Sequence, residues 1–121
     1  MVEHTDIFVS DSIENVKETV QQVFQQNEFK IQWSSEYDGR ASRGSKAKGI
    51  AFGALAQYND IDFKISTAPD KTVVVRLIRS TSGLTGGLLG RRKVKKQYKK
   101  IVEMISDHFS SIGTYKGREP K

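Results

Sequence analysis

Apolar and polar positions follow distinct periods along the chain, and the first two periods predict a strand followed by a helix. Residues 5–10 alternate between apolar and polar side chains, which is typical of a short strand. Over residues 12–27, apolar side chains recur three or four positions apart and form one face of an amphipathic helix. Asp11 and Ser12 suit the start of this helix, and Asp11 with Glu14 has the spacing of a capping box.

The next part of the chain predicts a hairpin. In residues 29–34 apolar side chains alternate with polar ones, which indicates a half-buried strand. Asp38-Gly39 is a strong signal for a hairpin turn. Residues 40–45 would form the returning strand, although their small side chains make this strand weak.

Two further strands and a second helix complete the pattern. Residues 58–66 alternate clearly, and Pro69 is well placed for the turn that follows. Residues 72–80 carry apolar side chains on both faces, which predicts a strand near the centre of the sheet. Residues 90–111 keep the helical period, and Gly113 suits the end of that helix.

These elements follow the order β-α-β-β-β-β-α. Consecutive hairpins give an antiparallel sheet of about five strands, and two helices that are apolar on one side must cover the same face of it. We therefore predict an α+β two-layer sandwich, formed by a single domain of residues 1–113 with a disordered basic tail at residues 114–121. The element order resembles the half-domain of the TATA-binding protein and, more loosely, the helix-grip lipid-binding domains. This likeness covers element order alone, so it implies a fold and no functional residue.

Two glycine-rich segments are predicted to meet at one end of the sheet. The hairpin turns lie at one end, so the connections after the third and fifth strands must lie at the other. These connections read KAKGIAFGALAQ at residues 46–57 and SGLTGGLLGRRK at residues 82–93. Three interpretations stay open. The apolar side chains fill the open end of the core, or they form an exposed lip that contacts a lipid interface or a partner. The third is phosphate or nucleotide binding, because loop amides that meet a helix N-terminus favour anions.

Charge is distributed unevenly along the chain, which has a net charge of +6. Residues 1–38 contain eight acidic and two basic side chains, whereas residues 39–102 contain three acidic and fifteen basic ones. Residues 72–102 contain no acid. This asymmetry fits an anionic partner. It equally fits neutralisation within the fold, with Glu14 and Glu18 of the first helix facing the cations of the second.

The candidate binding residues are the cations and apolar side chains of the glycine-rich end. Clustered cations at the start of a helix oppose the helix macrodipole by about 0.3–1 kcal/mol each and repel one another, so an internal or external anion should balance them. The candidate anion-binding residues are Lys46, Lys48, Arg91, Arg92, Lys93, Lys95 and Lys96. The candidate apolar lip comprises Phe52, Leu84, Leu88 and Leu89.

Motifs for catalysis, metal binding and nucleotide binding are missing from the sequence. The absence of cysteine excludes disulfides, zinc ribbons and thiol nucleophiles. The glycine-rich segments do not match the residue pattern of a Walker loop. His4 and His108 lack partners at metal-ligand spacing. Asp60 and Asp62 share a strand face with Lys64, which we expect to pair with Asp62. We therefore expect no cofactor, no metal and no catalytic residue.

A binding module is the function that these observations favour over an enzyme. It would present the basic, glycine-rich apolar end to an anionic partner, which is a lipid surface, a nucleic acid or an acidic protein. The alternative is a carrier or enzyme for a small hydrophobic ligand, with a cavity between the sheet and the helices. Homo-oligomerisation through the apolar loops also stays open. The first residues lack a secretory signal, so we expect a cytoplasmic location.

Overall fold

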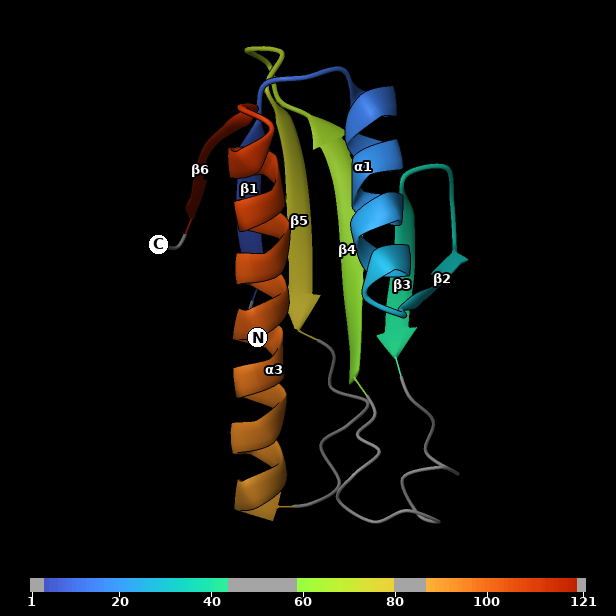
Figure 1. Cartoon of the computed structure of the whole chain (residues 1–121), viewed down its shortest axis with the longest axis vertical. Coiled ribbons are helices and arrows are strands. Elements are labelled where there is room, and N and C mark those ends of the chain that lie inside the picture. Colours follow the sequence, from blue (N-terminus) through green and yellow to red (C-terminus); the bar gives the residue numbers. More distant parts are fainter. Residues whose placement is uncertain (1–3, 44–58, 80–86, 120–121) are drawn as a thin grey trace.

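The computed structural model describes residues 4–43, 59–79 and 87–119, with the backbone alone for Asn59 and residues 87–95 (Figure 1). Within these ranges, six strands and two helices follow the order β-α-β-β-β-β-α-β. The elements are β1 (His4–Val9), α1 (Ile13–Gln26), β2 (Lys30–Trp33), β3 (Asp38–Arg43), β4 (Asn59–Thr67), β5 (Val73–Arg79), α3 (Gly87–Ser111) and β6 (Tyr115–Glu119). The predicted α+β class and the order of the first seven elements are confirmed.

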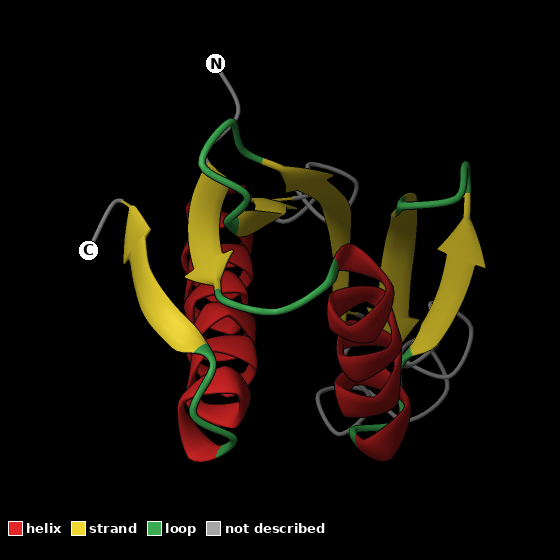
Figure 2. Cartoon of the chain, turned by 90° about the horizontal axis from the view of Figure 1, so that it is seen from above, coloured by secondary structure: helices red, strands yellow, loops and turns green. Residues whose placement is uncertain are grey.

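All six strands belong to one antiparallel sheet with the order β2-β3-β4-β5-β1-β6. Both helices pack on the same face of this sheet, as predicted (Figure 2). The apolar strand β5 lies in the interior of the sheet between β4 and β1, which also agrees with the prediction. The opposite face of the sheet carries neither helix.

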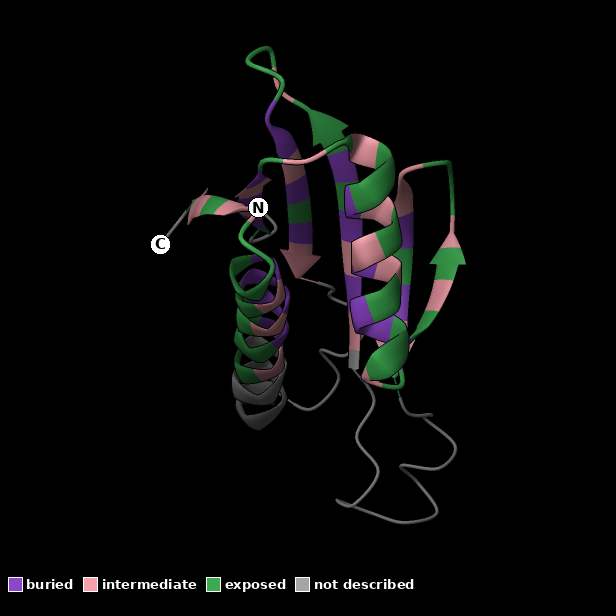
Figure 3. Cartoon of the chain, turned by 45° about the horizontal axis from the view of Figure 1, so that its top comes forward, coloured by how far each residue is buried: buried purple, intermediate pink, exposed green. Residues whose placement is uncertain are grey.

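The core lies between the sheet and the two helices, and the buried residues follow the side-chain period of each element (Figure 3). Alternate side chains of β4 and β5 are buried, and every third or fourth side chain of α1 is buried. Aromatic rings cluster under α1, where the Phe24 and Phe63 centroids are 5.7 Å apart and those of Phe24 and Phe29 are 5.2 Å apart. The largest buried side chains are Phe24, Phe63, Phe109, Ile7, Ile61, Leu77 and Ile105.

Local hydrogen bonds start helix α1 close to the predicted position. Ser12 is the N-cap, and its side chain accepts a hydrogen bond from the backbone N–H of Asn15 at 3.2 Å. Asp11 supports the same turn, because its carboxylate accepts from the Ser12 backbone N–H at 2.8 Å and from the Asn15 side chain at 3.1 Å. These bonds satisfy donors that the first helical turn leaves without partners.

The predicted hairpin turn at Asp38-Gly39 is wrong by several residues. The chain reverses within residues 34–37, and Gly39 already lies in β3, where it pairs with Trp33 on one side and Phe63 on the other. A Cβ atom at Gly39 would be 2.9 Å from the Gln32 carbonyl oxygen and 3.0 Å from the Phe63 ring. Glycine is therefore needed here for close packing of the Phe63 ring and not for the turn.

Residues 114–121, predicted to be a disordered tail, instead contain strand β6 at Tyr115–Glu119. Gly113 adopts φ 80°, which reverses the chain after α3, and β6 then pairs with β1. The Ser10 N–H donates to the Thr114 carbonyl at 2.8 Å, and Arg118 donates to the Ser106 hydroxyl at 3.3 Å. Backbone hydrogen bonds to β1 hold this polar segment in place, although it has no alternating apolar pattern.

Truncating core side chains tests this arrangement of faces. Phe63→Ala and Ile101→Ala should each lower the free energy of unfolding by about 2–5 kcal/mol, because each removes buried apolar atoms and leaves a cavity. Phe63 is 1% exposed and Ile101 is 4% exposed. Urea denaturation measures the loss. Ile112→Ala is the control: Ile112 is 49% exposed, so this substitution should change stability little. A loss of stability below about 1 kcal/mol at both core sites would contradict the assignment of these two side chains to the buried faces.

The turn between β4 and β5 depends on Asp70. Its carboxylate accepts a hydrogen bond from the Thr72 backbone N–H at 3.0 Å, and the Ala68 N–H donates to the Thr72 carbonyl at 2.8 Å. Hydrogen bonds from the backbone and side chain of Thr72 hold the pKa of Asp70 below its ordinary value of 3.8, and the charge of Lys116 adds to the effect. The ionised form of Asp70 is therefore favoured in the folded protein.

A lowered pKa in the folded state links this turn to pH. The stabilisation that Asp70 provides should be complete above its unfolded-state pKa and should disappear as the pH falls through the lowered folded-state value. We expect Asp70→Ala to reduce the melting temperature at neutral pH and to reduce it progressively less in acid. Thermal unfolding of both proteins across this range measures the difference, and a difference that is constant with pH would contradict the linkage.

Candidate functional site

The connections predicted to converge do leave the sheet at one end. The last residue of β3, Arg43, pairs with the first of β4, Asn59, and the last residue of β5, Arg79, pairs with Ile61 two positions further on. Helix α3 also begins at this end of the sheet (Figure 1). The strand ends therefore place the flanks of both glycine-rich segments together, whereas residues 44–58 and 80–86 themselves lie outside the described residues.

The predicted site residues differ in how far the structure describes them. Lys46, Lys48, Phe52 and Leu84 lie outside the described residues. The residues whose backbone belongs to α3 but whose side chains are not described are Leu88, Leu89, Arg91, Arg92, Lys93 and Lys95. Lys96 is described and its side chain is exposed. Whether the predicted lip is exposed or fills the core therefore stays a prediction.

Helix α3 separates its cations from its buried face. Lys96, Lys99 and Lys100 are exposed, whereas Tyr98 and Ile101 are each 4% exposed and face the sheet. Lys99 and Lys100 were missing from the predicted anion-binding residues, although the helical period places both on the solvent side. The described part of α3 thus presents three neighbouring ammonium groups to solvent.

Buried hydrogen bonds anchor this part of α3 to the sheet. The Tyr98 hydroxyl donates to the backbone carbonyl of Leu77 in β5 at 3.3 Å and lies 2.5 Å from the Thr5 hydroxyl in β1. Bonds to two strands set the rotation of the helix about its axis, so the flanking lysines face outward.

The arrangement of the helices does not favour neutralisation of these lysines by Glu14 and Glu18. Helices α1 and α3 run in opposite directions, so the first turns of α1 lie at the end of the sheet opposite to the start of α3 (Figure 1). Glu14 and Glu18 belong to those first turns of α1, and both side chains are exposed. The cations of the first half of α3 are thus far from these two acids along the helix axis.

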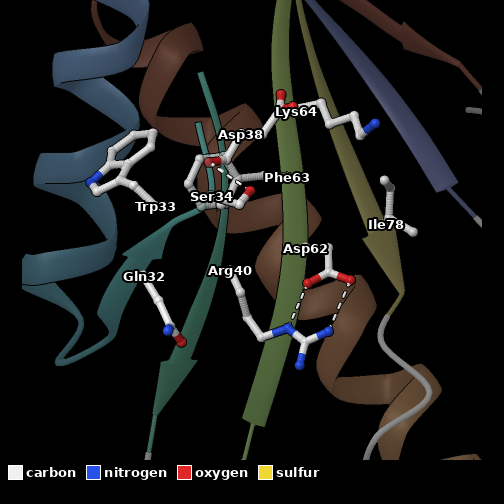
Figure 4. Close-up of a pocket in the computed structure, with 10 residues that line it drawn as sticks. Gln32, Trp33, Ser34, Asp38, Arg40, Asp62, Phe63, Lys64 and Ile78 are labelled. Carbon is white, nitrogen blue, oxygen red and sulfur yellow. Dashed lines mark hydrogen bonds and ion pairs between the residues drawn. The ribbon is translucent and has the colours of Figure 1, made fainter. Parts of the chain in front are cut away.

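A hollow of about 550 Å³ lies on the face of the sheet that carries no helix (Figure 4). Arg40 and Asp62 meet in it across β3 and β4: Nε donates to Oδ1 at 2.6 Å and Nη2 donates to Oδ2 at 3.3 Å. The remaining lining comes from β2 and the residue after it, from β3 and β4, and from β5: Gln32, Trp33, Ser34, Asp38, Gly39, Phe63, Lys64 and Ile78. This hollow lies on the opposite side of the sheet from the predicted ligand cavity, which stays a prediction.

Asp62 pairs with Arg40, so the predicted pairing of Asp62 with Lys64 is wrong. Arg40 lies directly opposite Asp62 in the antiparallel register, whereas Lys64 is two positions further along the same strand. Directly opposed residues have the closest Cβ atoms in a sheet. Both carboxylate oxygens of Asp62 thus accept hydrogen bonds from the Arg40 guanidinium.

A second bidentate pair joins β5 to β1 on the same face. Arg76 donates from Nε to Asp6 Oδ1 at 2.8 Å and from Nη2 to Oδ2 at 3.1 Å. The hydrogen bonds and charge of Asp6 raise the pKa of Arg76. Asp38, Lys64, Arg76 and Asp6 follow one another across this face through direct strand pairings. Acids and bases balance in this row, so it offers no concentrated positive charge to a polyanion.

No protein-family model matches the chain, and no curated protein is similar to it in sequence. In the ranges that the structure describes, no group of three or more His, Asp or Glu side chains is placed to hold a metal ion. Within the same ranges, neither helix combines the length and apolar character needed to cross a membrane. The fold and the charged surfaces are therefore the features that bear on function.

The two bidentate pairs offer a test of the open face. Double-mutant cycles with alanine should give coupling energies of about 0.2–1 kcal/mol for each pair, because both are reached by solvent. The Arg76–Asp6 coupling should be the larger, since the Asp6 side chain is 18% exposed and that of Asp62 is 36% exposed. Denaturation at low and high salt measures both. Couplings that are insensitive to salt, or larger for Arg40–Asp62, would contradict this ranking.

Proposed function

We propose that the chain is a small non-enzymatic binding module that presents the start of α3, with the flanking glycine-rich segments, to an anionic partner. The observation that carries this inference is the row of exposed Lys96, Lys99 and Lys100 on a helix whose other side is anchored in the core. Four further cations precede this row in the same helix, at residues 91–95. Such a concentration of like charge along one helix is unfavourable by itself, because the cations repel one another, and it is relieved by a bound anion.

An anionic lipid surface is the partner that best accounts for leucines beside cations. At a membrane boundary, leucines gain about 1.5–3 kcal/mol each on full burial, and each nearby cation adds about 1 kcal/mol. In this arrangement Leu84, Leu88, Leu89 and Phe52 enter the interface while the cations of α3 contact lipid phosphates. Nucleic acid and acidic protein offer the same negative charge without the apolar phase.

The balanced charges on the open face of the sheet support the proposal that the anionic partner binds at α3 and not on the sheet. A nucleic acid lying across the sheet would meet Asp6, Asp38 and Asp62 as well as the basic side chains. The basic end of α3 has no acid over residues 72–102. An anionic partner is therefore attracted to that end and not to the sheet.

Charge reversal on α3 tests this function. The triple variant Lys95→Glu, Lys96→Glu and Lys99→Glu should abolish binding to vesicles that contain anionic lipid. Binding of the unaltered protein should weaken steeply as salt is raised, because the attraction is electrostatic. Co-sedimentation with anionic and with neutral vesicles measures it, and DNA and RNA binding under the same salt series shows whether a nucleic acid is preferred.

A variant with the same change in net charge at other positions shows whether binding depends on the α3 lysines or only on the net charge of the protein. Lys30→Glu, Lys64→Glu and Lys116→Glu change the net charge equally at exposed positions of β2, β4 and β6, outside α3, and this variant should retain most of the binding. Circular dichroism confirms that both variants fold. Equal loss in both variants would show that only net charge matters. Unfolding of the α3 variant, with no binding to any polyanion at low salt, would show that these lysines serve the fold.

A further inference from the structure

The ammonium group of Lys17 lies between two aromatic rings at the β2 edge of the fold. Its Nζ atom is 4.7 Å from the centroid of the Trp33 ring and 5.2 Å from the centroid of the Tyr37 ring. Both distances are within the range at which a cation is attracted by the negative face of an aromatic ring. All three side chains are half-buried, so this group of residues is partly open to solvent.

The rest of the structure holds the two rings in place. Trp33 packs edge-on against the buried Phe63, with centroids 5.3 Å apart and an interplanar angle of 88°. The backbone carbonyl of Tyr37 accepts a hydrogen bond from the Ile65 N–H at 2.9 Å, which fixes the turn to strand β4. Ser34 closes the same turn by donating its N–H to the Asp38 carbonyl at 2.9 Å. The backbone that carries Tyr37 is therefore held by the sheet, and both rings pack against the hydrophobic core.

Two carboxylates contribute negative charge beside the rings. Partial burial, and after it the charges of Glu36 and Glu14, raise the pKa of Tyr37. Glu36 belongs to the turn that carries Tyr37, and Glu14 lies one helical turn before Lys17. The ring pair thus sits in the acidic part of the chain, where residues 1–38 contain eight acids and two bases.

We propose that Trp33 and Tyr37, with Glu14 and Glu36 beside them, form a binding site for a quaternary ammonium group that Lys17 occupies when no ligand is present. A quaternary ammonium has no N–H donor and is weakly hydrated, so it loses little on leaving water and gains from both ring faces. A lysine ammonium loses more hydration in the same position. The aromatic lining therefore suits a methylated cation better than the lysine that fills it.

Lys17 acts in this arrangement as an internal competitor. It is attached to α1 and loses no translational freedom when it enters the ring pair, whereas a free ligand does. The ligand must displace Lys17. Its apparent association constant is therefore the intrinsic constant multiplied by the fraction of molecules in which Lys17 has left the site. The site lies where α1 packs against β2, apart from α3, which packs against β5 and β6. It therefore does not depend on the function proposed for α3.

The fluorescence of Trp33 tests the site directly, because Trp33 is the only tryptophan of the chain. Tetramethylammonium chloride is titrated into the protein, with sodium chloride and ammonium chloride at the same ionic strength as comparison salts. We expect a saturable change with tetramethylammonium alone. Lys17→Ala should tighten this binding by about tenfold, because it removes the competing cation.

Further variants separate the site from a general effect of the salt. Lys17→Ala combined with Tyr37→Ala should lose the gain of about tenfold, because one ring face is removed. Lys64→Ala should titrate like the unaltered protein, since Lys64 is exposed on the other face of the sheet. Lys17→Gln retains much of the stem without the charge, and should also bind more tightly than the unaltered protein.

Two sources of the quaternary ammonium are distinguished by two titrations. Choline in solution and vesicles of phosphatidylcholine carry the same trimethylammonium group. Saturable binding of choline supports a free solute as ligand, whereas co-sedimentation of Lys17→Ala with neutral vesicles supports a lipid head group. The proposal is overturned if folded Lys17→Ala and Lys17→Gln show no saturable response to tetramethylammonium, or respond equally to sodium. The rings would then serve only to pack the stem of Lys17.

Discussion

The contact between Phe63 and Gly39 sets the register on which the rest of this fold depends. A side chain at position 39 would come within 3.0 Å of the Phe63 ring, so only glycine lets the ring lie flat over β3. The ring then meets Phe24 of α1 and Trp33 of β2, which ties the first helix and the edge strand to the sheet. A shift of one residue between β3 and β4 would turn Phe63 to solvent and separate Arg40 from Asp62. The core under α1, the ion pair on the open face and the position of the Trp33 ring therefore all share the register that accommodates this close contact.

Side-chain periodicity was sufficient to predict most of the architecture. Alternation in β4 and the helical period of α1 and α3 identified which side chains face the core, because burial of one face is what these patterns reflect. The turn before β3 was misplaced because the Asp38-Gly39 pair was interpreted as a turn signal, whereas Gly39 is required for packing. Strand β6 was missed because its stability comes from backbone bonds to β1, which leave no mark in the order of its side chains.

The candidate sites were predictable to different degrees for related reasons. The location of the basic end followed from topology, since strand directions alone decide which connections share an end of the sheet. The partner of Asp62 could not be predicted, because it depends on the cross-strand register, and register is a property of the folded sheet. The group formed by Lys17, Trp33 and Tyr37 combines a helix with a distant hairpin. No local spacing in the sequence indicates such a contact.

Strand β6 affects how readily the sheet could pair with a second copy of the chain. Without it, β1 would form the outer edge of the sheet, and its row of unpaired N–H and C=O groups would be a template for another extended chain. β6 covers that edge with a short strand that carries Lys116, Arg118 and Glu119 and is interrupted by an irregular register beside Val9. A bent, charged rim of this kind is a poor surface on which to extend a sheet. The five residues of β6, which carry no alternating apolar pattern, thus cover the edge that β1 would otherwise expose to another chain.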